Sequence, residues 1–301
     1  MLKLIKAIKP LVTGISLTML SIAFSPLFAE NVIHKIEPLN LTAQADYHKG
    51  DANKPAILII HGFLTTNQFH TVTSMAQGFK DEGFTVLAPT LTLGINLRKQ
   101  SVKCNSIHTH TLENDIIEID EWIKWLELQG KKEVVVIGHS SGSQELLALL
   151  EEKPQPNVKL AIFTSLFYLN GTDLGTIPEE LDYAAEALAS NNTKPHKYSF
   201  LFCKNDYYAT PQSFLSYHKL TREYVLNELK NLTIPHYTIM GSADKRYQSV
   251  GVNWLNELKE TGTNLITVEG ANHFFSSEYE FDLQENLVKI IQSNFPQQQG
   301  L

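Results

Sequence analysis

The 301-residue chain is poor in basic residues and in cysteine, and it has no internal repeat or low-complexity tract. Its 25 Lys and Arg residues are outnumbered by 32 Asp and Glu residues, which gives a formal net charge of −7. Such a surface repels phosphate backbones, so no nucleic acid partner is expected. A hydrophobic fraction of 43% with a charged fraction of 19% excludes a disordered chain. The length suits one large α/β domain with an insertion, or two modest domains.

The first 29 residues differ from the rest of the chain. Three lysines and no acidic residue precede an apolar stretch over 11–24, and a Pro-containing end closes on Ala29. This order is typical of a secretory signal peptide, and predicts a periplasmic or secreted protein with a formal charge of −10. No cysteine lies nearby to serve as a lipoprotein-type attachment site. An uncleaved membrane anchor is the alternative, and the only membrane contact we expect.

The two cysteines, Cys104 and Cys203, allow at most one disulfide. In an exported protein an even pair can be oxidised, and this bridge would close a long loop. Two unrelated buried thiols are the alternative, and the sequence does not distinguish the two.

Strand-like and helix-like segments alternate along most of the chain. Short apolar, β-branched runs predict strands at 32–41, 55–60, 84–88, 132–137, 158–163, 236–240 and 264–268. Helical patterns lie at 74–82, 112–126, 144–150, 254–258 and 283–291. The alternation predicts an α/β fold with a mostly parallel central sheet and helices on both faces. Ligands bind such sheets beyond the carboxyl ends of the strands.

The alternation breaks between Ser165 and Pro235, a stretch that holds 11 of the 29 Phe, Trp and Tyr residues. An insertion of this size predicts a cap over the active edge of the sheet, at about 166–235. Its aromatic side chains could line an apolar substrate pocket or build the cap's own core. For any single aromatic residue the core is favoured, and we expect only two or three to touch substrate.

The segment Gly138-His139-Ser140-Ser141-Gly142 carries the clearest chemical signal. It has the pattern G-x-S-x-G, with a β-branched run before it and a helix-forming run after it. A serine on the sharp turn between a buried strand and a helix is held with its hydroxyl exposed, and the turn requires small neighbours. Ser140 is therefore the predicted nucleophile.

A serine nucleophile needs a base, and the base needs a carboxylate that orients it. His273 follows the last predicted strand and is the only histidine C-terminal to His236, so it is the predicted base. Asp244 follows the preceding strand and is the predicted acid. Asp206, which also follows an apolar run, is the alternative, but it would place the acid inside the cap.

The early strand ends in His61-Gly62-Phe63-Leu64. In this arrangement the loop supplies one backbone N–H to an oxyanion hole, and the residue after the nucleophile supplies the other. We expect Phe63, with Leu64 as the alternative, and Ser141 in these roles. A plain turn between strand and helix is the structural alternative for this loop.

Three other histidines have no predicted catalytic role. His139 should pack in the elbow, and His108 and His110 suit solvated or capping positions, although they could reach the rim of the site. No acidic residue accompanies them at a metal-ligand spacing, so neither zinc nor another cofactor is expected.

Together, His61-Gly62-Phe63, the G-x-S-x-G segment, Gly241-Ser242-Ala243-Asp244 and Gly270-Ala271-Asn272-His273 resemble the α/β-hydrolase superfamily. The resemblance covers roughly Pro55 to Phe295 and is weakest in the cap. It implies an eight-stranded, mostly parallel sheet and acyl-enzyme chemistry, with the roles given above. Serine at the elbow differs from the aspartate of haloalkane dehalogenases and epoxide hydrolases. The absence of a His-Gly-Gly-Gly run separates the chain from hormone-sensitive-lipase-like esterases.

The expected function is an exported serine hydrolase, a carboxylesterase whose partner is a small-molecule acyl substrate. A lipase, thioesterase, peptidase or acyltransferase of the same fold are alternatives within the class. From another class, the chain could be a non-catalytic binding protein on a hydrolase scaffold.

Overall fold

The computed structural model describes residues 30–296, and the expected signal peptide lies outside the described residues. The strands are β1 (Glu30–Ile36), β2 (Leu41–His48), β3 (Ala56–Ile60), β4 (Thr85–Thr90), β5 (Val134–His139), β6 (Val158–Thr164), β7 (His196–Phe200), β8 (Cys203–Ala209), β9 (His236–Gly241) and β10 (Asn264–Val268). The helices are α1 (His70–Asp81), α2 (Leu112–Leu128), α3 (Ser141–Glu152), α4 (Pro178–Ala189), α5 (Pro211–Ser216), α6 (Arg222–Asn231), α7 (Tyr247–Val250), α8 (Asn253–Glu260) and α9 (Tyr279–Asn294).

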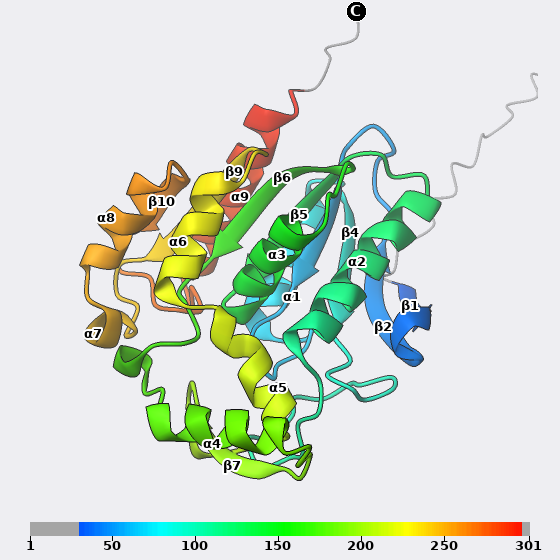
Figure 1. Cartoon of the computed structure of the whole chain (residues 1–301). Helices are drawn as coiled ribbons and strands as arrows, with labels where there is room; N and C mark the ends of the chain where they lie inside the picture. The colour runs from blue at the N-terminus through cyan, green and yellow to red at the C-terminus, as the bar shows by residue number, and fades with distance from the viewer. Residues whose placement is uncertain (1–29, 297–301) are drawn as a thin grey trace, which may run out of the picture.

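Eight of these strands form one sheet in the order β1-β2-β4-β3-β5-β6-β9-β10 (Figure 1). The six strands from β4 to β10 in this order are parallel to one another, whereas β2 is antiparallel to both β1 and β4. The prediction of an eight-stranded, mostly parallel sheet is therefore confirmed.

The first predicted strand was wrong in its extent. Where one strand was expected over 32–41, the structure has β1 and β2 joined by a short 3₁₀ turn at Glu37–Leu39. Pro38 cannot donate a ladder hydrogen bond, and Asn40 adopts a left-handed conformation with φ 52°. These two residues reverse the chain, so the apolar run folds back on itself as a hairpin.

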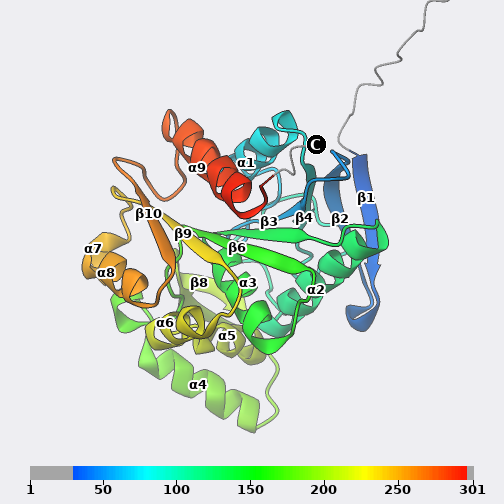
Figure 2. The same ribbon diagram turned by 90° about the horizontal axis from the view of Figure 1, so that it is seen from above.

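Helices cover both faces of the sheet, with α1 and α9 on one face and α2, α3 and α6 on the other (Figure 2). The strand β3 shows how the sheet divides the core. Leu58 and Ile60 pack into the cluster under α2 and α3, and Ile57 and Ile59 into the cluster under α1 and α9. Side chains alternate between faces along a strand, so a fully apolar run is required when both faces are covered.

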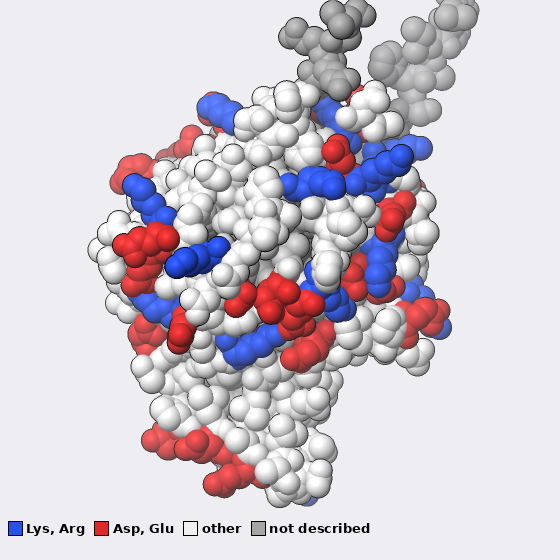
Figure 3. All heavy atoms as spheres, turned by 45° about the horizontal axis from the view of Figure 1, so that its top comes forward, with Lys and Arg blue, Asp and Glu red and all other residues white. Residues whose placement is uncertain are grey.

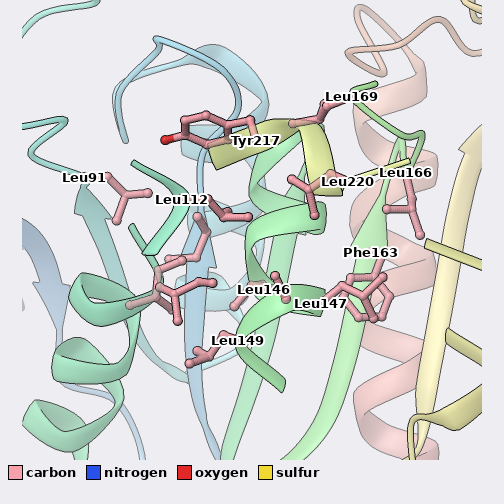
Figure 4. Packing of buried hydrophobic residues seen from close by; sticks show 14 of the residues in the cluster. Leu91, Leu112, Leu146, Leu147, Leu149, Phe163, Leu166, Leu169, Tyr217 and Leu220 are labelled. Carbon is pink, nitrogen blue, oxygen red and sulfur yellow. The ribbon is translucent and has the colours of Figure 1, made fainter. Parts of the chain in front are cut away.

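The larger core cluster lies between the sheet, α2, α3 and the insertion. Leu146, Leu147 and Leu149 of α3 lie in it together with Phe163 of β6 (Figure 4). Burial of each such side chain is worth about 1.5–3 kcal/mol relative to an exposed position.

No helix within residues 30–296 combines the length and the apolar character that spanning a bilayer requires.

The segment between β6 and β9 contains η2 (Thr172–Leu174), α4, β7, β8, α5, η3 (Tyr217–Lys219) and α6. The helix α6 lies over the sheet beside α3, whereas α4 and the β7–β8 hairpin lie beyond one end of the sheet (Figure 1). Acidic side chains gather at the α4 end, which contains Glu179, Glu180, Asp182 and Glu186 (Figure 3). Most of the eleven aromatic residues of this segment are buried and form the insertion's own core, including Tyr198, Phe200, Tyr207, Phe214 and Tyr217.

A disulfide between Cys104 and Cys203 joins the long loop after β4 to the start of β8. Two backbone hydrogen bonds also join these segments. The Tyr208 N–H donates to the Cys104 carbonyl at 3.1 Å, and the His108 N–H donates to the Tyr208 carbonyl at 2.8 Å. The loop therefore runs beside β8 and is fastened to the insertion at more than one point.

Removing this bridge in a Cys104→Ser/Cys203→Ser variant is expected to lower the free energy of unfolding by about 2–5 kcal/mol. The residues are 99 positions apart, and longer loops place the effect toward the upper end of that range. Urea unfolding followed by circular dichroism measures it, with the oxidised parent as reference. An unchanged unfolding midpoint would contradict the prediction.

Candidate active site

Ser140 stands at the turn between β5 and α3, partly exposed, with φ 54° and ψ −122°. A positive φ is costly for a serine and is kept only where the surrounding structure demands it. Its backbone N–H donates to the Thr164 carbonyl at 3.0 Å, which fastens the turn to the neighbouring strand. The hydroxyl is thereby held above the carboxyl end of the sheet.

The two glycines of the elbow allow close packing that no other residue would permit. A Cβ on Gly138 would lie 2.5 Å from the Gly142 carbonyl oxygen, and one on Gly142 would lie 2.5 Å from the His61 carbonyl oxygen. Both contacts are with backbone, which cannot move aside. The elbow can therefore press against β3 and the loop that follows it.

The structure brings Ser140, His273 and Asp244 together from three different strand ends. His273 Nε2 lies 2.9 Å from Ser140 Oγ, and His273 Nδ1 lies 2.6 Å from Asp244 Oδ2. The Asp244 carboxylate is 3% exposed, and its other oxygen accepts the Arg246 backbone N–H at 2.9 Å. The Ser165 hydroxyl donates to the His273 carbonyl at 2.6 Å and so holds the histidine loop. This is the hydrogen-bonded order that a nucleophile, a base and an orienting acid require.

Asp206, the alternative acid, lies elsewhere. It is on β8 and forms an ion pair with Lys197 at 3.1 Å on the exposed side of the hairpin. It therefore does not accompany His273 in this structure.

The proposed oxyanion loop passes directly beside the nucleophile. A Cβ built on Gly62 would lie 3.2 Å from the Ser140 Cβ. Within residues 30–296, the backbone N–H groups of Phe63 and Leu64 donate to no acceptor. Ser141 is the first residue of α3, so its N–H has no acceptor inside the helix. The site thus presents free backbone donors on both sides of Ser140.

A buried histidine and arginine hold this loop in place. His61 Nε2 lies 3.1 Å from both the Leu91 N–H and an Arg98 guanidinium nitrogen, so it acts as an acceptor. Burial, aided by Arg98, lowers the pKa of His61 to about 3 and keeps the imidazole neutral. Its Nδ1–H can then donate to the Gly62 carbonyl at 2.9 Å.

The insertion packs onto the same loop. The Phe63 ring lies with its centroid 5.3 Å from that of Phe200, 5.4 Å from Phe202 and 5.8 Å from Tyr207. Phe202 is 64% exposed at the tip of the hairpin. The β7–β8 hairpin therefore borders the site through Phe63.

The prediction of solvated or capping positions for His108 and His110 was wrong, because both are buried. The His108 ring stacks on Tyr207 at a centroid distance of 4.3 Å, and His110 Nδ1 lies 2.8 Å from the Tyr217 hydroxyl. They join the long loop to the insertion. His139 is buried in the elbow as expected, with Nδ1 3.0 Å from the Thr164 hydroxyl.

Sequence reasoning missed a buried acidic cluster below the elbow, formed by Asp115 and Glu118 of α2 and Glu145 of α3. Burial raises the pKa of Glu118 to about 7 and that of Glu145 to about 8. Glu118 accepts hydrogen bonds from the Thr92 N–H and hydroxyl, so it anchors the start of the long loop. The available signal was the spacing of Asp115 and Glu118, which fall among the apolar positions of an amphipathic helix.

Arg246 was also missed, although it lies two residues after the predicted acid. Its guanidinium lies over the Phe167 ring, with Cζ 5.7 Å from the ring centroid.

As for metals, residues 30–296 contain no group of three or more His, Cys, Asp or Glu side chains that could hold an ion.

Residues 57–281 match a family model described as "Alpha/beta hydrolase family". No curated protein sequence matches the chain. The long matched segment includes the elbow and the residues around Asp244 and His273.

Solved structures show the same fold at low identity. The alpha/beta hydrolase GrgF from Penicillium sp. sh18 superposes with a TM-score of 0.68 at 14% identity, over 89% of this chain and 99% of that one. Est1E from Butyrivibrio proteoclasticus has a TM-score of 0.60 at 14% identity, over 88% and 98%. The thioesterase domain from the curacin biosynthetic pathway has 0.59 at 17%, over 88% and 99%. These likenesses establish the fold.

Proposed function

This chain belongs to the alpha/beta hydrolase family, and from that premise we propose that it is an exported serine hydrolase. We propose further that it acts as a carboxylesterase on small or medium acyl esters. The observation that carries the proposal is the continuous hydrogen-bonded path from Ser140 Oγ through His273 to Asp244. Export rests on the composition of residues 1–29, which are outside the described part of the chain.

In the proposed reaction, Ser140 Oγ attacks the ester carbonyl carbon while His273 Nε2 takes its proton. Burial lowers the pKa of His273, and its hydrogen bond to Asp244 opposes that shift. The imidazole is therefore neutral at neutral pH and can accept the proton. Asp244 fixes the tautomer with the proton on Nδ1 and stabilises the imidazolium that forms.

The attack converts the carbonyl oxygen into an oxyanion beside Ser140. In this proposal the backbone N–H groups of Phe63 and Ser141 donate to it, with Leu64 as the alternative to Phe63. His273 then gives its proton to the leaving alcohol, and the acyl group stays on Ser140 Oγ. A water activated by His273 attacks the acyl-enzyme and releases the acid.

Hydrolysis of a chain-length series of 4-nitrophenyl esters by the purified protein tests this function. We expect turnover with a preference for small or medium acyl groups, and covalent labelling of Ser140 by a fluorophosphonate. Amide, thioester and micellar substrates in the same assay test the peptidase, thioesterase and lipase alternatives. A folded protein that neither hydrolyses any of these substrates nor takes up the label would favour a binding function instead.

A further inference from the structure

Arg246 is a partly exposed cation at the edge of the candidate active site. Its backbone N–H donates to Asp244 Oδ1, and its guanidinium rests on the Phe167 ring. Within residues 30–296, that guanidinium forms no ion pair and no hydrogen bond. The other two arginines differ, since Arg222 pairs with Glu257 at 2.6 Å and Arg98 donates to the Leu91 carbonyl at 2.6 Å.

The charge of Arg246 affects the pKa of the predicted catalytic base, His273. Burial is the larger cause, but Arg246 also lowers the pKa of His273 and of His139. Phe167, on which Arg246 rests, has its ring centroid 6.1 Å from that of His273. Asp244 interacts favourably with Arg246, but the cation still disfavours the imidazolium that must form when Ser140 is deprotonated.

For a neutral ester, this placement therefore raises the barrier to reaction. A substrate carboxylate would reverse the effect, because it would pair with the guanidinium and offset its field at His273. A planar guanidinium binds a carboxylate through two parallel hydrogen bonds, and the Phe167 ring lies within cation–π distance of this one.

We propose that Arg246 binds a carboxylate of the substrate, so that the enzyme prefers esters that carry a negative charge close to the scissile bond. This proposal rests on the serine hydrolase function proposed above. It assigns Arg246 the role of a specificity-determining residue, with half-esters of dicarboxylic acids or esters of carboxylated alcohols as the substrate class.

The test compares matched esters. Mono-4-nitrophenyl adipate and 4-nitrophenyl hexanoate differ by a carboxylate in place of a methyl group in the acyl part. The butyrates of 4-hydroxybenzoate and of 4-hydroxybenzamide differ by a carboxylate in the alcohol part. In at least one pair we expect the anionic ester to have a kcat/KM about 10- to 100-fold above the neutral one, the range of one charge-assisted contact.

Arg246→Met is expected to reduce that anionic-to-neutral ratio by about 10- to 100-fold, mainly through a higher KM for the anionic ester. Turnover of the neutral ester should rise, because His273 is freed from a neighbouring cation. Lys245→Met is the matched control, since Lys245 is the adjacent exposed cation and forms no ion pair within residues 30–296. It should leave the ratio at the parental value.

Calorimetric titration of the Ser140→Ala protein with mono-4-nitrophenyl adipate, with and without Arg246→Met, separates the two proposals. Arg246-dependent binding without turnover in the parent would support the carboxylate site and overturn the esterase. Turnover of the neutral esters with no anionic preference in either pair would support the esterase and overturn the carboxylate site. An equal loss of kcat/KM on anionic and neutral esters in Arg246→Met would also overturn the carboxylate site. That result would indicate that Arg246 only positions Asp244.

Discussion

Replacement of Ser140 with alanine is expected to reduce kcat for the preferred ester by about 10⁴- to 10⁶-fold. The change removes the oxygen that lies 2.9 Å from His273 Nε2, and with it the group that would form the acyl-enzyme. The fold should persist, because within residues 30–296 the hydroxyl makes this one hydrogen bond and the backbone N–H still donates to the Thr164 carbonyl.

Steady-state kinetics, together with melting curves of the same preparation, check this result. Ser249→Ala, an exposed serine of α7, is the matched control and should keep parental activity. A Ser140→Ala protein that retains more than about a hundredth of the parental kcat would rule out Ser140 as the nucleophile.

The second large effect is expected for Asp244→Asn, which should lower kcat by about 10⁴-fold. An asparagine amide can present its N–H toward His273 Nδ1, which then loses its proton to Nε2. A protonated Nε2 cannot accept from Ser140, so the base is lost although the geometry changes little. Asp244 is almost fully buried, so solvent does not stabilise the imidazolium in place of the missing carboxylate.

The alternative acid supplies the control for this experiment. Asp206→Asn removes the same charge from a carboxylate that pairs with Lys197 on the exposed side of β8. Its kcat should stay within about twofold of the parent, because Asp206 makes no contact with His273 and an exposed ion pair contributes little to stability. A large loss in Asp206→Asn with an active Asp244→Asn would show that the acid was assigned to the wrong strand end.

The parts of the molecule that could be predicted from sequence are those with a local signature. The β3, β5, β9 and β10 strands are apolar runs that stop at a chemically distinctive residue or turn. Because parallel strands place their carboxyl ends on one edge, Ser140, Asp244 and His273 were expected to meet, and the structure brings both Ser140 and Asp244 within hydrogen-bond distance of His273. The parallel sheet follows from the same alternation.

The structure of the insertion could not be predicted from local sequence patterns. The β7–β8 hairpin has no simple alternation of polar and apolar residues, and its position depends on pairing with the long loop through Cys104. The burial of His108 and His110 follows from that pairing, which the local sequence does not encode. The expectation of solvated side chains failed for this reason.

By itself, the sequence determined the parallel sheet, the strained serine turn and the candidate nucleophile, base and acid, since each depends on the period of a strand or on a short motif. Tertiary structure alone decided that Cys104 and Cys203 are joined, that Asp206 pairs with Lys197 and not with His273, and that the Arg246 guanidinium lies over Phe167 with no ion pair to any residue of 30–296. These features depend on distances between segments far apart in the chain. The pKa of His273 likewise depends on burial, Asp244 and Arg246 together, and these come from different parts of the chain.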